Sequence, residues 1–108
     1  MLPAKFYRDK FKEIESRLDN LIKSEWSPEF EKLMRNRLIM GYFRYGPFHR
    51  QNRTTEQMLA GIEKRVELYR QTGNDELLVD IANLAMKEFS TGNHPKKHFH
   101  SIDDGEHV

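Results

Sequence analysis

Apolar residues recur at intervals of three and four along most of this 108-residue chain, and no stretch alternates apolar and polar residues. That spacing lines up apolar side chains on one face of an α-helix, whereas a half-buried strand needs a two-residue period. Four segments carry the pattern, at about residues 3–23, 28–44, 55–71 and 76–89. The periodicity therefore predicts an all-α protein. Because the chain has room for one domain, we expect a four-helix bundle over residues 1–93.

The first segment carries its apolar residues at heptad positions. They are Tyr7, Phe11, Ile14, Leu18 and Leu21. Such a face can pack on the core of its own chain or form a seam with another chain, and we expect it to face the core of its own bundle. Small charged chains also often complete their core by self-association, so we expect a homo-oligomer.

Residues that start and stop helices bound the other segments. Ser27 can cap the second helix, and Thr54 with Gln57 fits a capping box at the start of the third. Gly73 can adopt the left-handed conformation that ends helices. Since about three residues join the third and fourth helices, these two must fold back as a C-terminal antiparallel hairpin. The His-rich residues 94–108 show no period, and we expect an irregular, extended or partly ordered tail.

Composition removes several classes of function. The chain has no cysteine, which excludes disulfide scaffolds, thiolate zinc sites and cysteine nucleophiles. Its formal net charge of +1 argues against binding a long nucleic-acid duplex through bulk charge. No apolar run approaches the roughly 18 residues of a membrane span. The N-terminus lacks the apolar core of a signal peptide, so we expect a cytoplasmic protein with no membrane partner.

Acidic residues of the predicted hairpin could converge. Glu63 and Glu67 share a face of the third helix, and Glu76, Asp80 and Asn83 share a face of the fourth. In an antiparallel hairpin Glu67 lies level with Asp80. Four carboxylates gathered there would suit Mg²⁺ or Mn²⁺, which could in turn hold a phosphate chain. The alternative is a solvated face whose acids pair with neighbouring basic residues.

Residues 76–86, with the sequence ELLVDIANLAM, resemble the second metal-binding helix of the MazG-type all-α nucleoside triphosphate pyrophosphohydrolases. That resemblance implies magnesium ligands at Glu63, Glu67, Glu76 and Asp80, with Asn83 orienting a water or the substrate. A second resemblance involves residues 41–46, 65–69, 72–74, 78–83 and 88–89 and the His-rich end. These segments are similar to small proteins of phages and mobile elements, which implies a phage or prophage setting but no particular chemistry.

Basic and aromatic residues crowd the end of the second predicted helix and the loop after it. Arg44, Tyr45, Arg50 and Arg53 are the candidates for ligand binding. Arginine forks match phosphate oxygens, and tyrosines offer a stacking face to a base. The set suits one nucleotide or a short strand. The alternative is a surface loop whose arginines pair with glutamates.

Three hypotheses for function follow from these features. The chain could be a magnesium-dependent nucleotide pyrophosphohydrolase, or a non-catalytic phage factor that sequesters a nucleotide signal. It could also be a helical module that binds a host protein, such as a defence protein. Nucleotide binding accommodates both resemblances and the Arg-Tyr segment, so we expect a nucleotide-binding protein and leave catalysis open.

Overall fold

The computed structural model describes residues 2–100, except for the side chains of Ser16, Asp19 and Leu21. The regular elements in that range are α1 (Ala4–Ser16), α2 (Leu18–Glu25), α3 (Pro28–Tyr45), α4 (Thr55–Thr72) and α5 (Glu76–Thr91), with a short 3₁₀ turn, η1 (Phe48–Arg50). No strand occurs among these residues, which confirms the all-α prediction. Residues 92–100 contain no helix, and the rest of the predicted tail lies outside the described residues.

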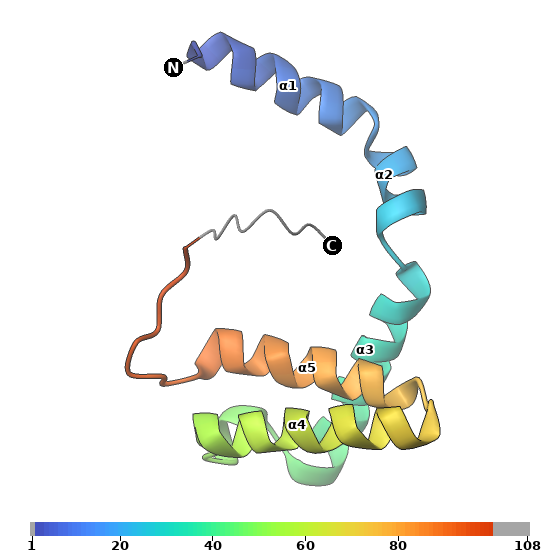
Figure 1. Ribbon diagram of the computed structural model, residues 1–108, viewed down its shortest axis with the longest axis vertical. Coiled ribbons are helices and arrows are strands. Elements are labelled where there is room, and N and C mark those ends of the chain that lie inside the picture. Colours follow the sequence, from blue (N-terminus) through green and yellow to red (C-terminus); the bar gives the residue numbers. More distant parts are fainter. Residues whose placement is uncertain (1, 101–108) are drawn as a thin grey trace.

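The predicted hairpin is formed by α4 and α5, which run side by side in opposite directions (Figure 1). The capping box of α4 is present, because the Thr54 hydroxyl accepts from the Gln57 N–H at 3.1 Å and the Gln57 side chain accepts from the Thr54 N–H at 2.9 Å. Gly73 ends α4 in the left-handed region, with φ 66°. The Asn74 side-chain oxygen then accepts from the Glu76 N–H and caps the start of α5.

Helix α3 packs against α5 and completes a three-helix unit. It begins where predicted, with the Ser27 hydroxyl accepting from the Phe30 N–H at 3.1 Å. The core of the unit is small. Met58 on α4 and Val79 on α5 are the only buried hydrophobic residues in the described part of the chain, at 2% and 3% exposed. A core this small leaves the packing of the three helices dependent on polar contacts as well.

The first predicted helix differs from expectation, so the four-helix count is wrong. The segment forms two helices, because Arg17 departs from helical geometry, with φ −109° and ψ 9°. Figure 1 shows α1 and α2 extending away from the hairpin. The radius of gyration is accordingly 17.9 Å, against about 13 Å for a compact chain of this length.

The heptad face of α1 does not pack on the core of its own chain, which corrects that expectation. Phe11 is 66% exposed, and Tyr7 and Ile14 are each about half exposed, as is Leu18 at the start of α2. The predicted seam residue Leu21 has a side chain outside the described set.

Within the described range, no helix is both long and apolar enough to cross a lipid bilayer.

Candidate functional site

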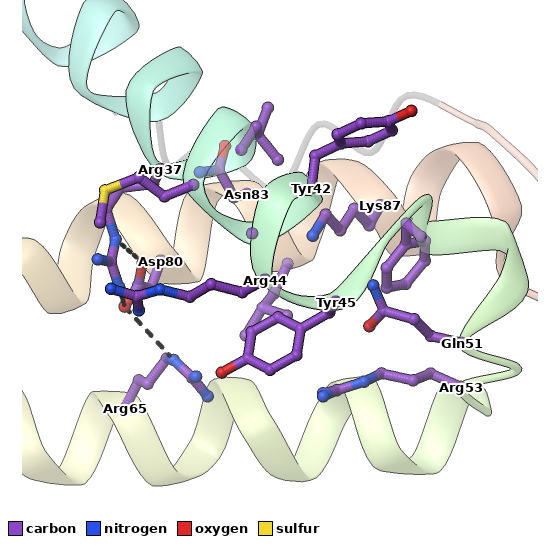
Figure 2. A pocket seen from close by; sticks show the side chains of 15 residues that line it. Arg37, Tyr42, Arg44, Tyr45, Gln51, Arg53, Arg65, Asp80, Asn83 and Lys87 are labelled. Carbon is purple, nitrogen blue, oxygen red and sulfur yellow. Dashed lines mark hydrogen bonds and ion pairs between the residues drawn. The ribbon is translucent and has the colours of Figure 1, made fainter.

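A cavity of about 360 Å³ lies between the C-terminal half of α3, the loop that follows it, and the facing side of the α4–α5 hairpin (Figure 2). We call it the basic cavity. Its polar lining consists of Arg37, Arg44, Gln51, Arg53, Arg65, Asp80, Asn83 and Lys87, and its aromatic lining of Tyr42, Tyr45 and Phe48.

The loop after α3 brings two parts of the sequence to the same cavity. Gly46 ends α3 with φ 75° and ψ −173°, a conformation essentially confined to glycine. The Gln51 side chain donates to the Gly46 carbonyl at 3.3 Å and closes the loop over η1. As a result, Tyr45 at the end of α3 and Arg53 before α4 line one cavity.

The cavity carries a strong excess of positive charge. Five basic side chains and one carboxylate line it, an excess of four positive charges in a chain whose net charge is +1. Arg44, Arg53 and Lys87 form no ion pair within residues 2–100. Like charges that lie close together without counter-ions repel, so binding of an anion in the cavity would be favourable.

Asp80 is the one carboxylate of the cavity, and it is already engaged (Figure 2). The Arg37 side chain donates to its two oxygens at 3.1 and 3.4 Å, and Arg65 Nε lies 3.8 Å from it on the other side. The hydrogen bond to Asp80 raises the pKa of Arg37 further above its ordinary value. Arg37 also lies 3.1 Å from the Glu76 carboxylate, so one guanidinium joins two acids of α5.

The pKa of Lys87 is shifted downward, in the opposite direction to that of Arg37. Burial lowers the pKa of its ammonium group, and the charge of Arg53 lowers it further, while Asp80 partly opposes both. Its Nζ lies 4.6 Å from the centre of the Phe48 ring, which gives the cation an aromatic face in place of a carboxylate. An anion placed between Lys87 and Arg53 would counter both of the effects that lower this pKa.

Asn83 forms part of the wall between α5 and α3. It is only 5% exposed, and its amide donates to the Met34 carbonyl at 3.0 Å. Its side-chain oxygen Oδ1 is buried and has no hydrogen-bond partner among the described residues. An unsatisfied buried acceptor is costly, so a hydrogen-bond donor reaching this wall would be stabilising.

The four predicted metal ligands do not come together. Glu63 is exposed, and Glu67 pairs with Arg70 and Gln71 on its own helix. Helix α4 instead turns Met58 into the core and Arg65 toward Asp80, and the two glutamates fall outside that face. In the described part of the chain, no group of three or more His, Asp or Glu side chains is arranged to hold a metal ion. The residues present therefore do not fit the magnesium that the MazG resemblance implies.

Three of the four predicted ligand-binding residues lie at the basic cavity. Arg44, Tyr45 and Arg53 line the basic cavity, while Arg50 lies on η1 and is not part of its lining. Arg37, which belongs to the same basic and aromatic segment of the sequence, lines the cavity as well. Sequence reasoning did not assign Arg65 or Lys87 to the site. Seven-residue spacing is a signal that could have found Lys87, because Lys87 follows Asp80 by two helical turns.

The basic cavity thus combines cations that have no ion-pair partner among residues 2–100, one acid paired with arginines, aromatic faces and a buried amide oxygen without a hydrogen bond. Its chemistry must be judged on this geometry, because neither family models, nor curated proteins, nor solved structures match the chain.

Proposed function

We propose that this chain binds a nucleotide through its phosphate groups in the basic cavity, without a metal ion. The observation that carries the proposal is the excess of cations in the cavity, three of which have no ion-pair partner in the described chain. Holding such charges together opposes folding. A bound polyanion would turn that repulsion into attraction and would therefore be selected by charge alone over neutral metabolites.

The side chains suit the two halves of a nucleotide. Arg44 and Arg53 can each donate two hydrogen bonds to a phosphate, and Lys87 adds a compact positive charge. Tyr42 and Tyr45 are exposed at the cavity and offer faces on which a base can stack. A volume of about 360 Å³ is near the lower end for small-molecule sites, so a mononucleotide suits it better than a duplex.

The arrangement favours capture over hydrolysis. The single carboxylate of the cavity, Asp80, is held by two guanidinium groups and is poorly placed to accept a proton or to bind a metal ion. This supports the second of the three hypotheses, a protein that sequesters a nucleotide. A phage setting enters the proposal only through the resemblance in sequence.

Titration calorimetry in the presence of a chelator tests the proposal. The panel contains mononucleotides, cyclic dinucleotides and inorganic phosphate. We expect at least one nucleotide to bind, and we expect Arg53→Ala and Lys87→Ala each to weaken it by about tenfold or more, because each removes a charge-assisted contact. Arg70→Ala and Lys64→Ala are matched controls, since both residues are exposed on α4 outside the cavity.

Three results would contradict the proposal. The first is that no nucleotide binds, and the second is that the control substitutions weaken binding as much as the cavity substitutions do. The third is that inorganic phosphate binds as tightly as the best nucleotide. That result would mean that the site recognises an anion and makes no use of the base or sugar.

A further inference from the structure

The apolar face of α1 lies uncovered. Its three heptad residues, Tyr7, Phe11 and Ile14, form what we call the α1 stripe, and each is about half exposed or more. Single exposed apolar side chains are common on protein surfaces, but a continuous stripe at heptad spacing is a feature of helices that pack on a partner.

The chain also exposes far more surface than a compact protein of its mass. Its accessible area is 9827 Å², whereas a compact 12.9 kDa chain exposes about 6,300 Å². The excess is about twice the roughly 1,600 Å² that a standard protein–protein interface buries in total. Part of this free surface lies on α1, which packs on neither helix of the hairpin and whose apolar residues are exposed.

The charges beside the stripe favour a second copy of this chain over an unrelated partner. With Phe11 at an a position and Tyr7 and Ile14 at d positions, Lys10 falls at g and Glu15 at the following e. In two parallel helices, g of one copy lies beside the next e of the other, so this opposite-charge pair forms twice. In an antiparallel pair with the same core residues, Glu15 would meet Arg8, but Lys10 would meet Arg17, which has the same charge. The parallel arrangement has no such like-charge pair.

Both charged groups are available for such a contact. Glu15 forms no ion pair in the described part of the chain. Lys10 lies 3.5 Å from Glu13 on its own helix, and an exposed pair of this kind contributes little and is readily exchanged.

We infer that a second copy of this chain covers the α1 stripe, with the two α1 helices parallel and Lys10 of each copy beside Glu15 of the other. The interface is separate from the basic cavity, because that cavity is built from α3, α4, α5 and the loop before α4. Each copy therefore keeps its cavity in the dimer, and nucleotide binding and dimer formation can be tested independently.

Analytical ultracentrifugation of the full chain over a wide range of concentrations tests the inference. The wild type is expected to shift from a single chain to a dimer as concentration rises. Phe11→Ala, which removes a ring from the centre of the stripe, is expected to raise the dissociation constant by at least about tenfold. Circular dichroism of each variant checks that helix content is unchanged.

Charge exchange tests the arrangement itself. Lys10→Glu and Glu15→Lys are each expected to weaken self-association, and an equimolar mixture of the two is expected to recover it, because the opposite-charge pair then re-forms between unlike copies. Lys12→Glu and Asp9→Lys make the same charge changes on the outer side of α1 and serve as controls.

A wild type that stays a single chain at every concentration would overturn the inference, as would a dimer that Phe11→Ala leaves unchanged. A mixture of the two charge variants that fails to associate would overturn the parallel pairing. So would tighter association of Lys10→Glu alone, since the new glutamate would then be meeting Arg17 of an antiparallel partner.

Discussion

One side chain of the basic cavity, Lys87, carries its charge in surroundings that disfavour the charged form. Lys87 is half-buried and faces Arg53, with an aromatic ring in place of a carboxylate partner. Asp80, by contrast, is paired with two guanidinium groups. The cavity therefore divides into a satisfied half around Asp80 and an unsatisfied half around Lys87, and the second half is where an anionic ligand gains most.

The lowered pKa of Lys87 predicts a pH-dependent stability. The unfolded chain holds this proton to higher pH than the folded chain does, so the free energy of unfolding rises with pH between the lowered pKa and the ordinary lysine value. Below that interval the charged lysine is a constant cost. We expect Lys87→Met, which keeps the stem and removes the charge, to be more stable than the wild type at neutral pH.

Urea denaturation across the alkaline range measures this effect. The advantage of Lys87→Met should shrink as pH approaches the ordinary lysine value, because the wild-type group then becomes neutral as well. Lys64→Met on the exposed side of α4 is the control and should show no such trend. An advantage that stays constant with pH would show that the gain comes from packing and not from charge.

At the scale of elements, two glycines end two helices in different ways. Gly46 has φ 75° and ψ −173°, whereas Gly73 has φ 66° and ψ 18°. The first conformation is nearly closed to any other residue, while asparagine tolerates the second. An added Cβ would meet no atom within 4 Å at either position, so the cost of a substitution there is one of backbone conformation.

We therefore expect Gly46→Asn to destabilise the fold by about 1–3 kcal/mol and Gly73→Asn by less than about 1 kcal/mol. Chemical denaturation of the two variants gives both values directly. Because Gly46 also sets the loop that carries Arg53, its variant should bind anions more weakly as well. Equal destabilisation by the two substitutions would contradict the assignment of the Gly46 strain.

The elements differ in how far sequence could predict them. Ser27, Thr54 and Gly73 act within a few residues of themselves, so the start of α3 and both ends of α4 were predicted correctly. The heptad pattern of α1 is the same for a core helix and for an intermolecular seam, so sequence could not choose between them.

The candidate site was predictable only in part for the same reason. Arg44, Tyr45 and Arg53 lie close together along the chain, and their shared cavity follows from the loop. Helix α4 buries Met58 and helix α5 buries Val79, and the local spacing of acids does not reveal which face each helix turns inward. The spacing of the acids therefore did not reveal that Arg65 is the residue of α4 that faces Asp80, while Glu63 and Glu67 are exposed.

At the scale of the whole molecule, the packed unit of α3, α4 and α5 is joined to a projecting arm of α1 and α2 (Figure 1). Short helices without tertiary partners are marginal in water, because nucleation is costly and few hydrogen bonds offset it. The arm of an isolated copy should therefore open far more often than the hairpin. If a second copy covers the α1 stripe, the same arm becomes protected when copies associate.

Hydrogen exchange at two protein concentrations separates these states. In dilute solution we expect amides of α4 and α5 to exchange slowest and those of α1 to exchange quickly. At high concentration the α1 amides should gain protection, while the hairpin amides change little, because their packing is complete within one copy. Phe11→Ala should abolish the gain. Strong protection of α1 at high dilution would instead mean that the arm is stable without a partner, and the exposed stripe would then need another explanation.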